Sequence, residues 1–585
     1  MLKIGKKILK FLRALCTVVG CIFLVFLVGL SVYGIVNRYP AAIEKNTYLV
    51  IDFNQQAISE NENSTLLEEL ADEQPLSFTK LLQSIEYASE DENITGLVAK
   101  INILGLEPAQ VQDIARAVAV FKAANKKTVV FSQGFGSFGH GNMEYYLASF
   151  FDKIYMQPHT YIGLTGIEIE VPFFKDILNK IGVSPEFYAR YEYKNAMASL
   201  TDNKMSAAYN EEMRGLGQSL MNEIEADITN NRKISEPLKN IINQAPLTTE
   251  QGLKFNLIDG VMYAQELDKL LKDEGAKHFV GIKDYAAGLY PNDGNLPTIA
   301  VLNLNGEIVD GKSENSLRQN NIIGSQNVVE DIEKIKKLDD LKAVVVNINS
   351  PGGSYNASDE IYFALQQLKK ETKVPLIVSQ SAYAASGGYF ISLAGDYILA
   401  EPMTITGSIG VLGGKMVLEK LWQKLGVNWE YIALGKNAGI LSANKPFSQA
   451  EKKIFNNSLD EVYRDFTSKV VENRKLTKPI DKVARGRVWT GRQALSLGLI
   501  DELGGYSNAL NKAIEMGKIA QNQNIKIVSF PEAKSFSEKV GDLIANTGSI
   551  KAEKLIEESG VDITNLKLFK RLQYDTVLLP FKINM

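Results

Sequence analysis

A serine in a turn of small residues is the first candidate for chemistry in this sequence. Ser386 lies in SAYAASGG, between the apolar segment VPLIVSQ and the helical pattern YFISLAG. The glycines behind it, Gly387 and Gly388, would expose the hydroxyl and leave the N–H group of Gly387 free to hold an anion. Turns of this composition more often serve close packing, so the serine needs support from other residues.

A second glycine loop precedes this one along the chain. The apolar segment AVVVNIN leads into Ser350, Pro351, Gly352, Gly353 and Ser354, and then into the helical pattern SDEIYFALQQLKK. Backbone N–H groups in such a loop, and at the helix N-terminus after it, stabilise negative charge. The two loops together predict a nucleophile with an oxyanion hole, which is the apparatus of acyl transfer.

A serine nucleophile needs a base, and the sequence offers no histidine near Ser386. His140, His159 and His278 all lie outside the half of the chain that holds the serine. A lysine can replace histidine when an apolar site lowers its pKa toward neutrality, and serine–lysine pairs are a known variant of the catalytic triad. The sequence therefore predicts a lysine as the base.

The elements that would carry these residues are written twice. In the same order, TYLVIDFN resembles TIAVLNLN, GLVAKIN resembles AVVVNIN, EYYLASFFDKIYMQP resembles GYFISLAGDYILAEP, YKNA resembles GKNA, and LIDG resembles LIDE. Alternating apolar strands and amphipathic helices predict an α/β fold with tandem copies over residues 46–289 and 297–520. The first copy has Asn142 opposite Ser386 and ILGLE opposite SPGGS, so only the second keeps the acyl-transfer apparatus.

The two ends of the chain differ from this body. Residues 1–13 are rich in Lys and Arg, and residues 14–36 carry no charge. This pattern predicts a cytoplasmic segment and an uncleaved transmembrane anchor, which is favoured over a cleaved signal peptide. The body would lie on the periplasmic side of a bacterial inner membrane. Residues 521–585 alternate charged and apolar positions, which predicts a helical extension.

Composition excludes several functional classes. The 64 basic and 68 acidic side chains give a net charge of -4, which leaves no basic face for nucleic acid. The only cysteines, Cys16 and Cys21, lie in the predicted anchor, so the body has no disulfide framework or cysteine metal site. Because the sequence has no phosphate-binding P-loop and only three histidines, we expect neither a cofactor nor a metal.

Four motifs in this order carry a resemblance to a known family. NSPGGS at Asn349, SAYAASGGY at Ser381, TGSIGV at Thr406, and YKNA followed by DNKMS at Tyr193 resemble the long, duplicated form of the signal peptide peptidase A (protease IV) family. The resemblance covers roughly residues 45 to 520. It implies the repeated β-β-α units of the Clp protease/crotonase superfamily.

The same resemblance implies roles for named residues. Ser386 would be the nucleophile and Lys194 of the first copy the general base, with oxyanion donors at Gly387 and at Gly352 or Gly353. In short, unduplicated members the lysine comes from the same copy as the serine. Lys436 in GKNA is therefore a competitor of Lys194. Thr406 and Ser408 would orient the lysine or the substrate.

The family's activity implies the remaining expectations. The substrates would be hydrophobic peptides such as remnant signal peptides, cleaved by a membrane-anchored serine protease that forms a homo-oligomer, specifically a tetramer. Two alternatives remain open from the sequence. One is a crotonase-like acyl-CoA enzyme, because similar glycine loops stabilise a thioester enolate. The other is a non-catalytic membrane scaffold with the same fold.

Overall fold

The structure is a computed structural model that describes residues 43–60, 74–136, 138–289, 296–313, 322–520, 523–533, 535, 538 and 582–585. The predicted basic segment 1–13 and anchor 14–36 lie outside these residues. Within the described ranges, no helix is both long and apolar enough to span a bilayer.

The first copy is built on a parallel sheet with the strand order β11-β6-β5-β4-β1-β12. Its central strands are apolar and buried, as expected for a parallel sheet covered on both faces. The strands are β1 (Thr47–Asp52), β4 (Ile94–Lys100), β5 (Lys127–Ser132), β6 (Lys153–Met156), β11 (Gly260–Val261) and β12 (His278–Gly281).

The second copy has an eight-stranded sheet with the order β21-β19-β17-β16-β13-β23, in which β18 joins β17 to β22. Only the β19–β21 pair is antiparallel. The strands are β13 (Thr298–Asn305), β16 (Leu341–Ser350), β17 (Leu376–Ala385), β18 (Tyr397–Ala400), β19 (Ile405–Gly407), β21 (Val488–Thr490), β22 (Glu502–Leu503) and β23 (Lys526–Phe530).

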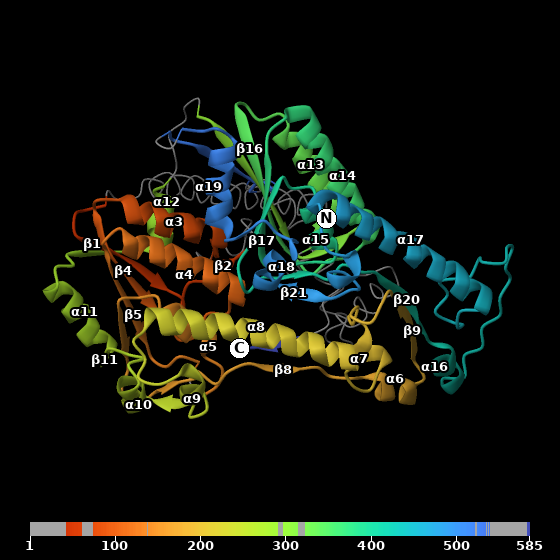
Figure 1. Cartoon of the computed structure of the whole chain (residues 1–585), viewed down its shortest axis with the longest axis horizontal. Coiled ribbons are helices and arrows are strands. Elements are labelled where there is room, and N and C mark those ends of the chain that lie inside the picture. The colour runs from red at the N-terminus through yellow and green to blue at the C-terminus, as the bar shows by residue number, and fades with distance from the viewer. Residues whose placement is uncertain are drawn as a thin grey trace, which may run out of the picture.

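Helices cover both sheets (Figure 1). Those of the first copy are α3 (Phe78–Glu90), α4 (Pro108–Ala123), α5 (Asn142–Ala148), α6 (Lys175–Ile181), α7 (Ala198–Thr201), α8 (Ala207–Asn231), α9 (Leu238–Ile242), α10 (Thr249–Lys254), α11 (Ala264–Asp273) and α12 (Ile282–Ala287). Those of the second are α13 (Ser325–Ile335), α14 (Tyr355–Thr372), α15 (Gly387–Ser392), α16 (Glu419–Lys424), α17 (Gln449–Arg474), α18 (Gly491–Leu497) and α19 (Tyr506–Met516).

Short strands complete the fold as two-stranded pairs. They are β2 (Ile58–Ser59) with β3 (Leu76–Ser77), β7 (Tyr161–Ile162) with β10 (Leu247–Thr248), β8 (Glu168–Glu170) with β24 (Lys582–Asn584), β9 (Ser184–Ala189) with β20 (Leu412–Val417), and β14 (Glu307–Val309) with β15 (Ile322–Gly324).

The two copies repeat individual contacts as well as the order of elements. The hydroxyl of Tyr145 donates to the carbonyl of Leu257, and that of Tyr389 donates to the carbonyl of Leu499, both at 2.8 Å. An arginine–aspartate ion pair also recurs, as Arg232–Asp259 in the first copy and Arg474–Asp501 in the second. The structure thus has the duplicated α/β fold that the sequence predicts.

The prediction of a helical extension over residues 521–585 is wrong for the described part of that segment. Lys526–Phe530 forms β23, which pairs in parallel with β13 at the edge of the second sheet. The β-branched pair Ile527 and Val528 suits a strand. Residues 582–584 also form a strand, β24. The second copy therefore continues beyond residue 520.

The copies interlock instead of meeting at a flat boundary. β9 of the first copy pairs antiparallel with β20 of the second, and α8 runs along the second copy beneath β21 (Figure 1). A single apolar cluster contains core residues of both sheets, including Leu49 and Val301. Arg116 forms two hydrogen bonds with the buried carboxylate of Glu401 across the same interface. This interlocking brings first-copy residues into the second copy's turns.

Candidate active site

Ser386 occupies a strained turn between β17 and α15. Its backbone has φ 55° and ψ -111°, a conformation that costs a non-glycine residue of order 1–3 kcal/mol. The turn is held because the N–H of Ser386 donates to Gly407 at 2.8 Å and its carbonyl accepts from Phe390 at 2.8 Å. The side chain is buried, with a residual exposure of 1%. A strained turn between strand and helix presents a nucleophile at a fixed point.

The side chain of Lys194 reaches this serine from the first copy. Its Nζ lies 3.0 Å from Ser386 Oγ, 3.0 Å from the carbonyl oxygen of Ser408 and 2.9 Å from Ser408 Oγ. The carbonyl can only accept a hydrogen bond, and the Ser408 hydroxyl donates its own hydrogen to the Gly486 carbonyl. Two N–H bonds of a neutral amine therefore point to Ser408. Its lone pair then faces the Ser386 hydroxyl.

Burial gives this lysine the proton affinity of a general base. The residue is 5% exposed, and desolvation lowers the pKa of Lys194 to about 7, although the nearby Glu212 charge opposes this shift. Near neutral pH a substantial fraction of the amine is thus uncharged and able to accept a proton.

Strand pairing and two glycines place the lysine. After β9 leaves its pairing with β20, the N–H of Arg190 donates to Val411 and that of Tyr193 donates to Arg485. A Cβ atom added at Gly486 would lie 2.5 Å from Lys194 Cβ, and one at Gly410 would lie 3.3 Å from Lys194 Cδ. Only glycine allows the second copy's backbone to come so close to the lysine.

The first copy fills the corresponding space differently. Asn142 stands where the second copy has Ser386, and its side-chain amide donates to Gly166 at 2.7 Å and accepts from the same residue at 3.0 Å. Gly166 follows Asn142 at the spacing by which Gly410 follows Ser386. The asparagine therefore closes on the backbone where the second copy admits a lysine.

The structure does not bring Lys436 to Ser386. Lys436 is exposed in the loop between α16 and α17, a loop that lies at the right of Figure 1. Ser386 is buried at the start of α15. Of the two candidate lysines, only Lys194 contacts the serine hydroxyl.

The two glycine loops converge as the oxyanion prediction requires, with one refinement. The N–H of Gly352 donates to Ser350 Oγ at 3.2 Å, so this group is already engaged. A Cβ on Gly387 would lie 3.3 Å from the nitrogen of Gly353, which places these two residues side by side. We therefore favour Gly353 and Gly387 as the donors.

Gly353 is held by the backbone of Ile308. The N–H of Ile308 donates to Gly352 at 2.9 Å, and its carbonyl accepts from Ser354 at 2.8 Å. A side chain at Gly353 would place its Cβ 2.0 Å from the Ile308 carbonyl oxygen, and the residue has a φ of 157°. Glycine is therefore required at this position.

The remaining predicted residues have ordinary partners. Thr406 donates to the Ala384 carbonyl at 2.9 Å, so it braces the turn and does not touch the lysine. Among the histidines, His140 is exposed and His278 pairs with Glu44. The described ranges hold no cluster of His, Cys, Asp or Glu side chains suited to a metal.

Residues that sequence reasoning missed are Gly486, Gly410 and the buried Glu212. Gly486 and Gly410 lie against the lysine side chain, and the charge of Glu212 acts on its amine. Gly410 stands in TGSIGV, but that motif does not show what lies beside it, and no motif marks Gly486 or Glu212. Only the folded structure, in which β9 pairs with β20, places these residues around the lysine.

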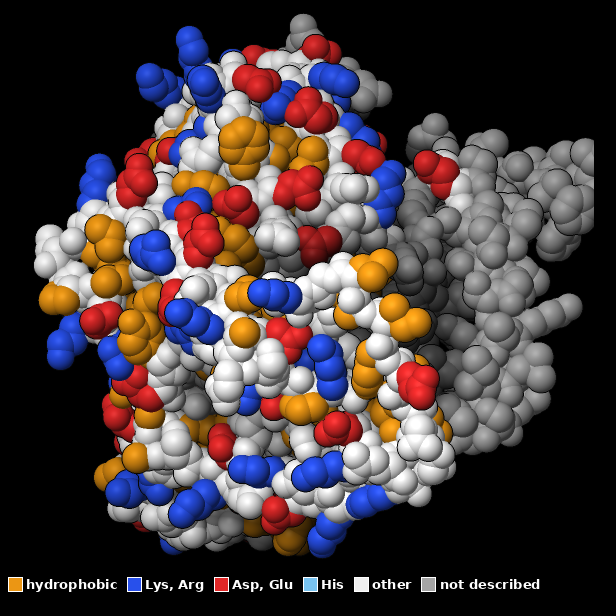
Figure 2. All heavy atoms as spheres, turned by 90° about the vertical axis from the view of Figure 1, so that its right-hand side faces the viewer, with side chains coloured by type: hydrophobic (Ala, Val, Ile, Leu, Met, Phe, Trp, Pro, Cys, Tyr) orange, Lys and Arg blue, Asp and Glu red, His pale blue; other side chains and the backbone are white. Residues whose placement is uncertain are grey.

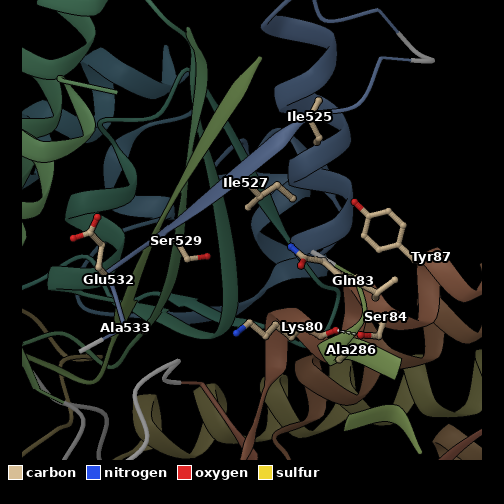
Figure 3. Close-up of a pocket in the computed structure, with 11 residues that line it drawn as sticks. Lys80, Gln83, Ser84, Tyr87, Ala286, Ile525, Ile527, Ser529, Glu532 and Ala533 are labelled. Carbon is tan, nitrogen blue, oxygen red and sulfur yellow. Dashed lines mark hydrogen bonds between the residues drawn. The ribbon is translucent and has the colours of Figure 1, made fainter. Parts of the chain in front are cut away.

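A separate cavity of about 240 Å³ lies between α3 and α12 of the first copy and β23 of the second (Figure 3). None of its lining residues belongs to the serine–lysine site. They are Lys80, Gln83, Ser84, Tyr87, Ala286, Leu289, Ile525, Ile527, Ser529, Glu532 and Ala533.

Comparison with known proteins finds matches over most of this chain. The model of peptidase family S49 matches residues 106–277 and 368–520, and that of Clp protease matches residues 317–403. Protease 4 of Haemophilus influenzae is 30% identical over 98% of this chain and 96% of its own length. The chloroplastic serine protease SPPA of Arabidopsis thaliana is 32% identical over 81% and 70%. Protease 4 of Salmonella typhi is 31% identical over 76% and 73%.

The close approach of Gly486 to Lys194 leads to a test with an internal control. Gly486→Ala should displace the lysine and slow phosphonylation of Ser386 by a serine-directed phosphonate about 100-fold, as expected for a displacement of roughly 1 Å. Gly426 also has a positive φ, 72°, but an added Cβ meets nothing within 4 Å. Gly426→Ala should therefore carry similar backbone strain and keep wild-type reactivity. Equal losses in both variants would contradict the proposed role of Gly486.

Proposed function

This chain belongs to peptidase family S49 and is a serine protease, and we propose that it cleaves peptides with a Ser386–Lys194 dyad assembled from both copies. The observation that carries the proposal is the contact of 3.0 Å between Lys194 Nζ and Ser386 Oγ, with both remaining amine contacts made by Ser408. The buried amine has the pKa of about 7 that a base needs at neutral pH.

The proposed reaction has an acylation half and a deacylation half, and Lys194 acts first as base and then as acid in each. Lys194 Nζ takes the Ser386 proton as Oγ attacks the peptide carbonyl, and the N–H groups of Gly353 and Gly387 stabilise the oxyanion. The C–N bond breaks, and the lysine ammonium gives its proton to the leaving amine. Water then attacks the acyl-enzyme with Lys194 again as base, and the released Ser386 regains its proton.

We propose remnant signal peptides and other hydrophobic peptides as substrates, cleaved beside the membrane. The support is the uncharged run 14–36 behind a basic segment, which suits a single anchor with the body on the periplasmic side. Membrane-embedded peptides would then be close to the active site.

We also propose that copies of this chain form a closed assembly, specifically a tetramer. Gly182 after α6 and Gly426 after α16 are equivalent and have positive φ values, 93° and 72°. In the first copy the next segment forms β9 and pairs with β20, whereas residues 427–434 of the second copy are exposed. Ile432 and Leu434 are both 96% exposed, and Figure 2 shows apolar side chains on this face. A neighbouring copy that presents residues 168–173, which precede α6 as β20 precedes α16, would cover them.

Activity of three variants tests the dyad. Ser386→Ala and Lys194→Ala should lower kcat/KM for a fluorogenic peptide by about 1000-fold or more, whereas Lys436→Ala should stay within about twofold of wild type because that lysine is exposed. Peptide cleavage by Ser386→Ala would overturn the mechanism, and a wild-type chain that cleaves no peptide would favour the scaffold or acyl-CoA alternatives. Loss of activity only in Lys436→Ala would overturn the choice of base.

Membrane fractionation tests the anchor. The full chain expressed in a bacterium should remain in the pelleted membranes after an alkaline carbonate wash, because a spanning segment resists extraction. Protease added to spheroplasts should digest the body. A body that is digested only after lysis would contradict the proposed periplasmic location.

Disulfide trapping tests the assembly in a background with Cys16→Ser and Cys21→Ser. Within the chain, Pro185 of β9 pairs with Met416 of β20. Trp429 follows Gly426 at the spacing by which Pro185 follows Gly182, and Pro172 precedes α6 at the spacing by which Met416 precedes α16. Trp429→Cys combined with Pro172→Cys should cross-link neighbouring copies into disulfide-linked species of two, three and four chains. Phe363→Cys, at a residue that is 61% exposed on α14, should not cross-link to Trp429→Cys. A monomeric mass in light scattering without cross-links would contradict the proposal.

A further inference from the structure

Outside the dyad, the buried carboxylate of Glu212 joins two chain segments that form the site. Glu212 lies on α8 and is 2% exposed. Its Oε2 accepts a hydrogen bond of 3.0 Å from the side-chain amide of Asn195, and its Oε1 accepts one of 2.8 Å from the N–H of Val488. A carboxylate with two such donors is fixed in position.

Each of these two partners is adjacent to a working part of the site. Asn195 directly follows Lys194 in the chain. Val488 follows Gly486 and Arg487. The Ser408 hydroxyl donates to the Gly486 carbonyl at 3.3 Å, and the Ser408 N–H donates to the Arg487 carbonyl at 2.8 Å. Ser408 in turn receives two hydrogen bonds from the lysine amine. Glu212 therefore ties the segment that carries the base to the segment that orients it.

The charged neighbours of Glu212 leave its carboxylate without a direct ion pair. Arg487 pairs with Glu211 at 2.8 Å instead, and its guanidinium also lies over the ring of Trp489. Tyr209, one turn earlier on α8, has a pKa raised by burial and stays neutral. Besides Arg487, the charged group that acts on Glu212 is the ammonium form of Lys194.

We infer that Glu212 is a positioning residue for Lys194, whose carboxylate fixes the lysine-bearing segment through Asn195 and places a negative charge beside that segment. The inference rests on the proposed Ser386–Lys194 dyad and names a residue that positions the lysine of that dyad. Burial favours the neutral amine, and the carboxylate opposes that effect. This balance keeps the lysine basic enough to take the serine's proton.

The electrostatics are consistent with this geometry from both sides. The charge of Glu212 raises the pKa of Lys194 against desolvation. Burial raises the pKa of Glu212 to about 7, and the hydrogen bonds from Val488 and Asn195 and the charges of Arg487 and Lys194 oppose that shift. Each charge therefore favours the other, and both groups change protonation in the same pH range.

The pH dependence of kcat/KM for a fluorogenic peptide tests the inference with a matched pair of variants. Activity needs the neutral amine, so it should fall as pH drops through about 7 in the wild type. Glu212→Gln removes the charge. It should lower the pH at which kcat/KM falls to half its maximum, the acid limb of the profile, by about 0.5 pH unit or more. Glu211→Gln changes the adjacent, exposed glutamate on the same helix and should leave the limb in place.

Two further variants separate charge from position. Glu212→Asp keeps the charge and should keep the acid limb of the wild type even if the rate falls. Asn195→Ala removes a hydrogen bond that both positions the Glu212 carboxylate and favours its charged form, so it should lower kcat and move the limb in the same direction as Glu212→Gln, but by less. An unmoved limb in Glu212→Gln, or an equal movement in Glu212→Asp, would overturn the inference.

Lys194→Ala distinguishes failure of this inference from failure of the dyad. If Lys194→Ala is inactive and the wild-type limb lies near pH 7 while Glu212→Gln leaves it unmoved, only the role of Glu212 is wrong. If Lys194→Ala retains activity, the proposed function itself is wrong.

Discussion

The site depends on a lysine amine of one copy being buried inside the other. Burying a charged ammonium is costly unless it is paired, and Lys194 has no carboxylate in direct contact; its three partners are Ser386, the Ser408 carbonyl and the Ser408 hydroxyl. The amine therefore gives up its proton easily, and its lone pair faces the serine. The interlocking of the two copies has this consequence, because only the β9–β20 pairing carries the lysine so deep.

Much of the surrounding structure follows from this burial. The lysine backbone passes so close to Gly486 that no side chain fits there. Ser386 is held at a positive φ because it donates a hydrogen bond to β19 and accepts one from α15. The first copy shows the same architecture without the chemistry, since Asn142 binds the backbone of Gly166 directly. In the proposed dyad, one copy supplies the base and the other supplies the nucleophile and the oxyanion hole.

The sequence predicts those features of the site that are local. Ser386, Gly387 and Gly353 stand in loops between a strand and a helix, where spacing and glycine content reveal their purpose. Lys194 required the family resemblance, because its contact with the serine depends on the register between β9 and β20. That Gly352 is already occupied by Ser350 could not be read from two adjacent glycines. Glu212 carries no motif, and the strand at Lys526–Phe530 was hidden by the helical pattern that follows it.

The most direct test of the central claim is the pH dependence of Ser386 phosphonylation, measured by mass spectrometry on the full chain with a serine-directed phosphonate. This reaction reports activation of the nucleophile without deacylation or product release. The structure predicts a rate that is half-maximal near pH 7, the pKa of buried Lys194, and that is lost in Lys194→Ala. A rate that rises only toward pH 10, the ordinary range of an exposed lysine, or that survives in Lys194→Ala, would contradict the account.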